Sequence, residues 1–171
     1  MPRADHDAVD RITAQWQAVR PDLDVSPIGV IGRVSRLSRL LDRRLAENFA
    51  RYGIENWMYD VIATLRRQGE PYELTAGDLV RQTMVTTGAI TNRIDRLEQR
   101  GLVERGRADD RRKVIVRLTR RGLDLVETVV DSHLATERDI LAALTPRQQQ
   151  DLGRLLRATL LALGDRAVAV P

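Results

Sequence analysis

The sequence predicts a mainly helical protein with one β hairpin near the middle of the chain. Apolar residues recur every three or four positions along most of its 171 residues, which is the period of amphipathic helices. The stretches with this period are residues 5–19, 28–52, 56–68 and 123–165. Two runs rich in β-branched residues, 102–107 and 113–118, follow a different pattern and predict two strands joined by a polar tip.

The helices at the two ends of the chain carry more apolar surface than a small central module can cover. Thr145 followed by Pro146 predicts the N-cap and the first residue of the last helix. Apolar helix faces of this kind are commonly covered by a second copy of the chain, so a homodimer is expected. The expected organisation is a single domain, 1–171, with dimerisation helices at 5–52 and 123–165 and a central lobe at 56–122.

The central lobe has the order of elements found in a known DNA-binding module. Residues Thr75 to Asp78 can cap a short helix, and a second helix is expected from Thr87 to Arg100, closed by Gly101. Helix, turn, helix and then a basic hairpin is the plan of a winged helix. The predicted fold is therefore mainly α: a winged helix-turn-helix with a two-stranded β wing, flanked by N- and C-terminal dimerisation helices.

Charge and composition agree with a DNA-binding protein and exclude several other classes. Residues 75–122 hold 12 Lys or Arg against 6 Asp or Glu, whereas the rest of the chain holds 16 against 18. Such a local excess is expected of a surface for a polyanion. The chain has no cysteine, which excludes disulfides and thiol chemistry. No apolar run approaches the roughly 18–20 residues of a membrane span, and the N-terminus lacks a signal-peptide core, so a cytoplasmic protein is expected.

The helix from Thr87 to Arg100 has one apolar face and one polar face. On a helical wheel, Ile90, Ile94 and Leu97 share the inner face, whereas Asn92 and Arg96 lie opposite them. Asn and Arg can make bidentate contacts with adenine and guanine edges. The DNA contacts expected on and before this helix are Thr86, Thr87, Gly88, Thr91, Asn92 and Arg96. An ordinary solvated helix face is the alternative interpretation.

The tip of the hairpin carries a second group of expected DNA contacts. Asp110 and Arg112 are two residues apart, so the carboxylate can hold the guanidinium extended towards a narrow minor groove. Arg111 lies between them and is included in the same group. A solvated charge cluster without a role in binding is the alternative.

The segments 86–97, 101–103 and 110–119, the last ending in the pattern Leu-Thr-x-x-Gly, closely resemble the MarR family of winged-helix regulators. The resemblance covers about residues 28–165. It implies a homodimer, recognition helices in successive major grooves of double-stranded DNA and wing arginines in the flanking minor grooves. It also implies a repressor that leaves its operator when a small, often anionic, ligand binds.

The N-terminal extension is similar to that of the urate-responsive subfamily of MarR regulators. That subfamily is marked by a Trp, an Asp and two Arg, and the matching positions here are Trp16, Asp60, Arg93 and Arg105. The resemblance implies that urate lies near Trp16 and Arg105 and repels Asp60, and that Arg93 carries the movement to the recognition helix. On the residues alone, Arg93 points towards the scaffold and needs an anionic partner, which Asp60 can supply.

Several alternatives to a urate sensor stay open. Asp60 and Arg93 can form a structural salt bridge without a sensing role, Trp16 can be a packing residue, and Arg105 can be a wing or phosphate contact. Citrate-like acids or other metabolites are alternative effectors. A DNA-binding architectural protein without any ligand is the second hypothesis for function.

An enzyme is not expected, and neither is a cofactor. The two histidines are His6, near the N-terminus, and His133, within a long helix. His133 and Glu137 are four residues apart and can share a metal ion on a helix face, but a surface ion pair is the favoured interpretation. No phosphate-binding glycine loop and no nucleophile paired with a base stands out.

Overall fold

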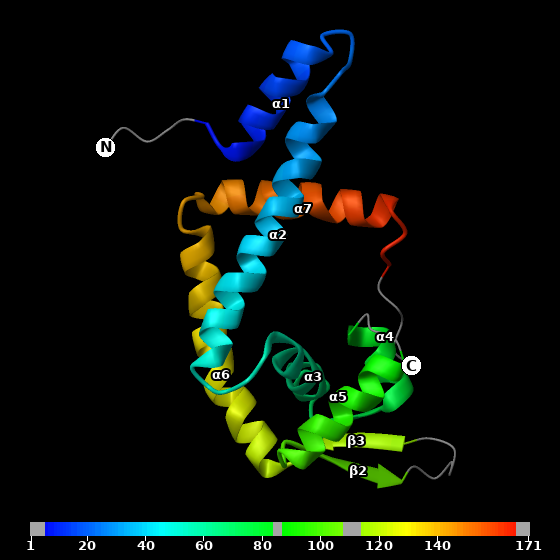
Figure 1. The fold of residues 1–171 in the computed structure, drawn as a ribbon. Coiled ribbons are helices and arrows are strands. Elements are labelled where there is room, and N and C mark those ends of the chain that lie inside the picture. The colour runs from blue at the N-terminus through cyan, green and yellow to red at the C-terminus, as the bar shows by residue number, and fades with distance from the viewer. Residues whose placement is uncertain (1–5, 84–86, 108–113, 167–171) are drawn as a thin grey trace. The chain divides into compact units, whose positions relative to one another are not determined.

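The computed structural model describes residues 6–83, 87–107 and 114–166. The chain is mainly helical, as predicted (Figure 1). It divides into two compact units, residues 1–44 and 45–171. The boundary between the units falls inside the long helix α2, Ser26–Ala50. Within the described ranges, no helix has both the length and the hydropathy needed to cross a membrane.

The first unit pairs helix α1, Ala8–Val19, with the start of α2. Asp7 caps α1 by accepting hydrogen bonds from the backbone of Val9 and Asp10. Arg33 of α2 donates hydrogen bonds to the carboxylates of Asp7 (2.8 Å) and Asp10 (2.6 Å). The hydrogen bond from Arg33 lowers the pKa of Asp10. These contacts fasten the short helix to the long one, with Val9 buried between them.

The second unit contains the winged helix and two further helices. Its elements after α2 are α3 Asn56–Arg66, β1 Glu73–Thr75, α4 Ala76–Thr83, α5 Thr87–Gln99, β2 Val103–Arg107, β3 Val114–Leu118, α6 Arg120–Leu141 and α7 Pro146–Ala162. The capping residues predicted from the sequence are confirmed at two helix starts. Thr75 accepts a hydrogen bond from the backbone N–H of Asp78 at the start of α4, and Thr145 forms a capping box with Gln148 at the start of α7.

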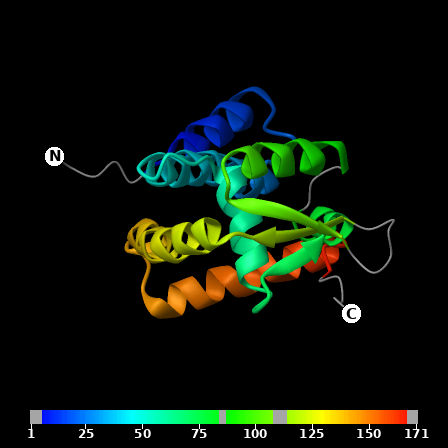
Figure 2. The same cartoon turned by 90° about the horizontal axis from the view of Figure 1, so that it is seen from below.

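The sheet differs from the expected two-stranded wing because it has three strands. The order is β1-β3-β2, and both pairs are antiparallel, with Leu74 of β1 opposite Val116 of β3 (Figure 2). The two predicted strands are confirmed as β2 and β3, and β1 is a third strand that the sequence analysis did not predict. Strand β1 is three residues long, which is too short to show a reliable alternation in the sequence. It is held in place because β3 supplies a partner from more than 40 residues further along the chain, with Glu73 opposite Arg117.

The core of the second unit lies between α3, α4, α5, the sheet and the first half of α6. The residues that form its most buried part are Met58, Val61, Ile62, Leu65, Leu79, Ile90, Ile94, Leu97, Leu102, Val103, Val116, Val126 and Val129. The Leu-Thr-x-x-Gly pattern has a structural reason at this point. Thr119 donates a hydrogen bond to the carbonyl of Gly101 (2.7 Å), and a Cβ on Gly122 would lie 2.0 Å from the carbonyl oxygen of Leu102. Only glycine lets α6 start this close to the wing.

Candidate nucleic-acid interface

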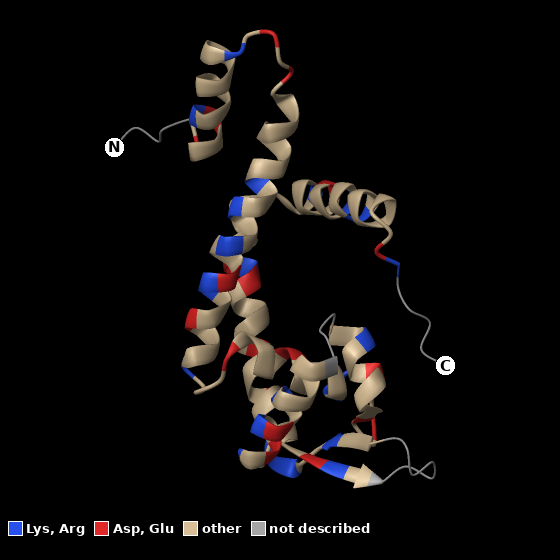
Figure 3. Ribbon diagram, turned by 45° about the vertical axis from the view of Figure 1, so that its right-hand side comes forward, with Lys and Arg blue, Asp and Glu red and all other residues tan. Residues whose placement is uncertain are grey.

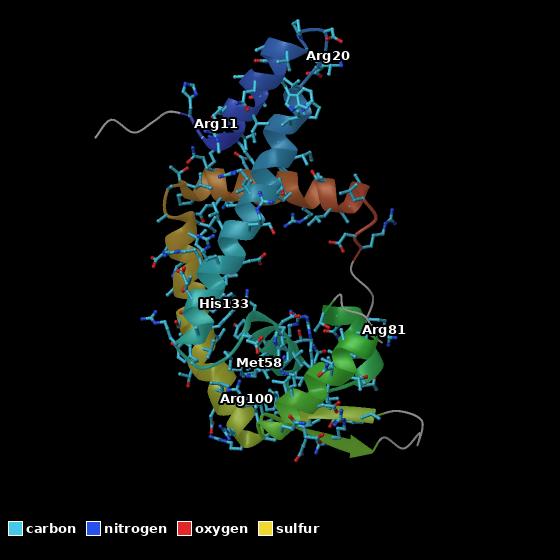
Figure 4. The ribbon with its side chains drawn as sticks, in the orientation of Figure 1. Arg11, Arg20, Met58, Arg81, Arg100 and His133 are labelled. Carbon is cyan, nitrogen blue, oxygen red and sulfur yellow. The ribbon has the colours of Figure 1, made fainter. Side chains whose placement is uncertain are left out.

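Helix α5 presents the two faces predicted from its sequence. Ile90, Ile94 and Leu97 are at most 2% exposed, so the inner face is confirmed. The C-terminal end of the helix is fixed by Arg100, which donates hydrogen bonds to the carbonyl of Gly53 (2.8 Å) and to the sulfur of Met58 (3.1 Å) (Figure 4). Helix α5 is thus held against α3 and its outer face is turned away from the core.

The outer face of α5 is open to a large ligand. Gly88, Thr91 and Asn92 are exposed, and a Cβ added at Gly88 would meet no atom within 4 Å. Backbone at this position can therefore approach a flat or bulky surface closely. The other expected contacts, Thr86 before the helix and Asp110, Arg111 and Arg112 at the wing tip, lie outside the described residues. Thr87 is the first residue of α5.

Arg96, also on the outer face, has partners that the sequence analysis missed. Its Nη2 donates a hydrogen bond to Oε1 of Glu55 (2.8 Å), and its guanidinium carbon lies 4.7 Å from the centre of the Trp57 ring. The Nε1–H of Trp57 donates to the other oxygen of Glu55 (2.8 Å). The hydrogen bond from Trp57 is the main reason that the pKa of Glu55 is lowered, and the charge and hydrogen bond of Arg96 lower it further. The sequence gives no signal for this contact, because Glu55 and Arg96 are 41 residues apart.

A shallow hollow of about 230 Å³ lies beside this group of residues. Its lining is Trp57, Ala89, Asn92, Arg93 and Arg96. Arg93 also faces the indole, with its guanidinium carbon 5.7 Å from the ring centre. Two arginines thus flank one aromatic side chain next to the exposed Asn92.

Arg105, on β2, is engaged by two acids of α5. Its guanidinium forms ion pairs with Asp95 and Glu98, and its backbone N–H donates to Oε1 of Glu98 (3.2 Å). The hydrogen bond that Arg105 donates to Asp95 is the first cause of the raised pKa of Arg105. Figure 3 shows acidic and basic positions side by side where α5 meets the strands. Arg105 therefore ties β2 to α5, and an anion that binds it has to compete with two carboxylates.

Asp60 and Arg93 interact electrostatically without a direct ion pair between them. Asp60 lies on α3 and is partly buried, and this burial raises the pKa of its carboxyl, against the opposing effect of the positive charges of Arg93 and Arg67. The guanidinium of Arg93 is directed to the Trp57 ring. Burial therefore disfavours the ionised form of Asp60, and Asp60 is close enough to Arg93 for their charges to interact.

Trp16 lies in the first unit and the other three positions of the expected effector site lie in the second. The indole is 45% exposed and borders a surface hollow of about 230 Å³ that is lined by Ile12, Gln15, Trp16 and Val19. Trp16 is therefore an accessible aromatic side chain. That it joins Asp60, Arg93 and Arg105 in one site stays a prediction.

His133 is not the surface residue expected from the sequence. Its ring packs against Phe49 (centres 5.3 Å apart) and Tyr59 (4.7 Å), while Nε2 lies 3.3 Å from Glu137. The expected pair with Glu137 is confirmed, but His133 is partly buried, because Phe49 of α2 and Tyr59 of α3 pack over this turn of α6. Across the described parts of the chain, no three His, Asp or Glu side chains gather as a metal site would require.

This arrangement, in which α4 and α5 are followed by a three-stranded sheet and α5 turns a polar face outward, defines a winged-helix protein. Residues 52–113 match the MarR family. The chain is 42% identical to the HTH-type transcriptional regulator PecS of Dickeya dadantii (strain 3937), over 86% of this chain and 90% of that protein. The chain therefore belongs to the MarR family of transcriptional regulators.

Solved structures of the family show the same fold. A cysteine-to-serine mutant of MarR from E. coli, complexed with operator DNA, is 27% identical, with a TM-score of 0.71 over 81% of this chain and 99% of that one. BpsR of Bordetella bronchiseptica is 25% identical, with a TM-score of 0.69 over 76% of this chain and 91% of that one. The BpsR structure concerns the regulation of its DNA binding by 6-hydroxynicotinic acid.

Proposed function

We propose that this MarR-family regulator binds a pseudo-palindromic DNA duplex as a homodimer, represses transcription there, and leaves the DNA when a small planar anion such as urate binds. The observation that carries the proposal is the outer face of α5, where Gly88, Thr91 and Asn92 are exposed while Ile90 and Ile94 anchor the helix in the core. DNA binding is further supported by the likeness to MarR, which was solved with operator DNA.

The homodimer is supported by apolar side chains that the single chain leaves uncovered. In the first unit they are Ile12, Trp16, Val19, Leu23, Val30, Ile31, Val34, Leu37 and Leu40, and in α7 they are Leu155, Leu156, Leu160 and Leu161. An apolar surface of this extent is unusual for a monomer. A two-fold dimer presents two recognition helices to one side of the duplex, so the half-sites should lie about 10–10.5 bp apart.

An anionic effector is supported by the charges around α5. Asp60 of α3 holds a charge that burial disfavours, and the positive charge of Arg93, on α5, offsets part of this cost. A new negative charge nearby would raise the cost of ionised Asp60 and attract Arg93. At Arg105, the same anion would weaken the ion pairs with Asp95 and Glu98 that fix α5 to the wing. Both effects change the position of α5, on which DNA binding depends.

Urate is the effector expected from the resemblance, and Trp16 offers a flat apolar face for it. BpsR, which is controlled by an aromatic acid, supports a planar anion. A citrate-like acid or another metabolite is the alternative effector. An architectural DNA-binding protein, which ignores all of these ligands, is the alternative function.

The test is a DNA titration in the presence of urate, xanthine, 6-hydroxynicotinic acid or citrate. The probe is the tightest duplex that the wild-type protein selects from a randomised library. We expect urate to weaken DNA binding by about 5–150-fold, the usual range of allosteric coupling. The variant Arg105→Ala should bind DNA but respond less to urate. Urate that binds without changing DNA affinity would overturn the sensor, and absence of any duplex binding would overturn the regulator.

A further inference from the structure

The residues around Arg96 form a cluster that the proposed function does not use. Glu55 occupies the N-cap position of α3 with an extended backbone, φ −100° and ψ 158°, but its side chain makes no capping hydrogen bond. The carboxylate instead accepts hydrogen bonds from Trp57 Nε1 and from Arg96 Nη2, both at 2.8 Å. Glu is not one of the residues that favour the N-cap position, and the partners of this carboxylate are Trp57 and Arg96 rather than the backbone of the helix.

The two partners of Arg96 occupy different parts of the guanidinium. Trp57 covers its face, with the guanidinium carbon 4.7 Å from the ring centre. Glu55 accepts a hydrogen bond from Nη2, at the edge of the guanidinium. Arginine binds guanine through two N–H groups on its edge, to O6 and N7, and leaves its face free. Arg96 can therefore keep Trp57 when it contacts a base. Both two-pronged edges of a guanidinium include Nη2, so Glu55 competes with the guanine for this nitrogen.

We infer that Glu55 and Trp57 are positioning residues for Arg96: Glu55 holds the arginine in the DNA-free protein, Trp57 orders it in both states, and exchange of Glu55 for a guanine edge is a step of base recognition. This inference rests on the proposed DNA binding. The partner that replaces Glu55 is the N7 and O6 edge of one guanine in each half-site.

The exposure of the pair makes this exchange feasible. The side chains of Arg96 and Glu55 are 50% and 55% exposed, so water screens their attraction and the bond is easily given up. Pairs of this kind change an equilibrium by about two- to fivefold. Glu55 nevertheless stays ionised at neutral pH, because Trp57 and Arg96 lower its pKa. The pair is thus present when DNA arrives and weak enough to be replaced.

The first measurement concerns the free protein. The chain has two tryptophans, so its indole N–H signals are assigned by comparing the wild-type ¹H–¹⁵N spectrum with that of Trp57→Phe. The Trp57 signal should move in Glu55→Gln, which removes the charge but keeps the shape. It should stay in the control Glu104→Gln, an exposed acid on β2 that lies 3.9 Å from Arg117. An unmoved Trp57 signal in Glu55→Gln overturns the inferred cluster.

The second measurement is the affinity for the tightest duplex that the wild-type protein selects from a randomised library. Glu55→Gln should bind it about two- to fivefold more tightly, because Arg96 no longer has to leave a charged partner. The gain should vanish in the Arg96→Ala background, and also on a duplex in which 7-deazaguanine, which lacks N7, replaces the contacted guanine. Glu104→Gln removes a charge that does not contact Arg96, so the gain in DNA affinity that it gives should persist in the Arg96→Ala background.

Trp57 is tested by the preference for the selected duplex over a shuffled one. Trp57→Leu should reduce this preference by about two- to fivefold because the guanidinium loses its aromatic support. Trp57→Phe keeps a ring face and should restore most of it. The unfolding midpoint of each variant separates this effect from lost packing, since Trp57 also lies against the core.

The outcomes distinguish this inference from the proposed function. Equal gains for Glu55→Gln with and without Arg96 would mean a general charge effect and would overturn the positioning role alone. So would an unchanged affinity of Glu55→Gln for a duplex that the wild type binds. A wild-type protein that selects no duplex would overturn the proposed DNA binding, and the role of Glu55 in base recognition with it.

Discussion

The winged-helix lobe and the first unit of the chain differ in how their apolar side chains are covered. In the lobe, residues 56–122, the side chains of Met58, Ile62 and Leu97 are at most 2% exposed. In the first unit, Val30 and Ile31 on α2 are 64% and 63% exposed. The lobe therefore completes its core within one chain, whereas the first unit leaves an apolar face that a second copy can cover. This contrast supports the proposal that the lobe recognises DNA and that the helices outside it form the dimer.

The largest expected effect comes from the closest contact in the lobe. Gly122→Ala places a Cβ 2.0 Å from the carbonyl oxygen of Leu102, which is backbone and cannot move aside. We expect a loss of more than about 3 kcal/mol in the free energy of unfolding, measured by urea denaturation. Gly153→Ala in α7 is the matched control, because a Cβ added there meets no atom within 4 Å. This change should leave the free energy of unfolding the same or raise it. Equal effects of the two changes would contradict the packing described for the lobe.

The next effect should fall on the dimer and leave the lobe folded. Leu37→Glu puts a charge on the apolar face of α2, where Leu37 is 42% exposed in the single chain. Desolvating an unpaired carboxylate in an interface is costly, so we expect dimer affinity to fall by at least about tenfold. Sedimentation equilibrium measures this, and circular dichroism checks that the helices persist. Arg36→Glu, about 100° round the helix, is the control and should leave the dimer intact.

A smaller effect separates base recognition from phosphate contact within the lobe. Asn92→Ala on the outer face of α5 should cost about 1–3 kcal/mol on the selected duplex and little on random DNA. Arg112→Ala at the expected wing tip should weaken binding to both duplexes and lower the salt slope by about one. Fluorescence anisotropy over a range of salt concentrations distinguishes them. The same loss on both duplexes for Asn92→Ala would place base recognition elsewhere.

The smallest effect concerns the charge of Asp60. Burial raises its pKa above the ordinary value of 3.8, so the folded protein binds this proton more tightly than the unfolded chain does. The contribution of Asp60 to stability therefore increases as the pH falls through the raised pKa, and it is complete below 3.8. At neutral pH the ionised carboxylate lowers stability, and Asp60→Asn should raise the unfolding midpoint. The gain over wild type should shrink as the pH falls; a gain that does not depend on pH would contradict this assignment.

Much of the fold was predictable because it depends on local periodicity. The buried positions Ile90, Ile94 and Leu97 follow from the helical period, and the cap at Thr145 follows from the proline after it. Strand β1 was not predicted, because its three residues carry too little pattern and depend on a distant strand.

The candidate site was predictable only in part, for the same physical reason. The outer face of α5 follows from its own sequence. The partners of its charged residues do not: Glu55 lies 41 residues before Arg96, and Arg105 meets Asp95 and Glu98 from a different element. Such ion pairs are set by how α3, α5 and β2 pack together, which no single stretch of sequence reveals.

The most direct test of the division between the lobe and the outer helices is the composition and footprint of the DNA complex. Native mass spectrometry counts the chains on the selected duplex, and hydroxyl-radical footprinting locates their contacts. We predict two chains on one duplex, with two symmetric protected half-sites about 10–10.5 bp apart. One chain on a single asymmetric half-site, bound as tightly as the pair, would contradict the account.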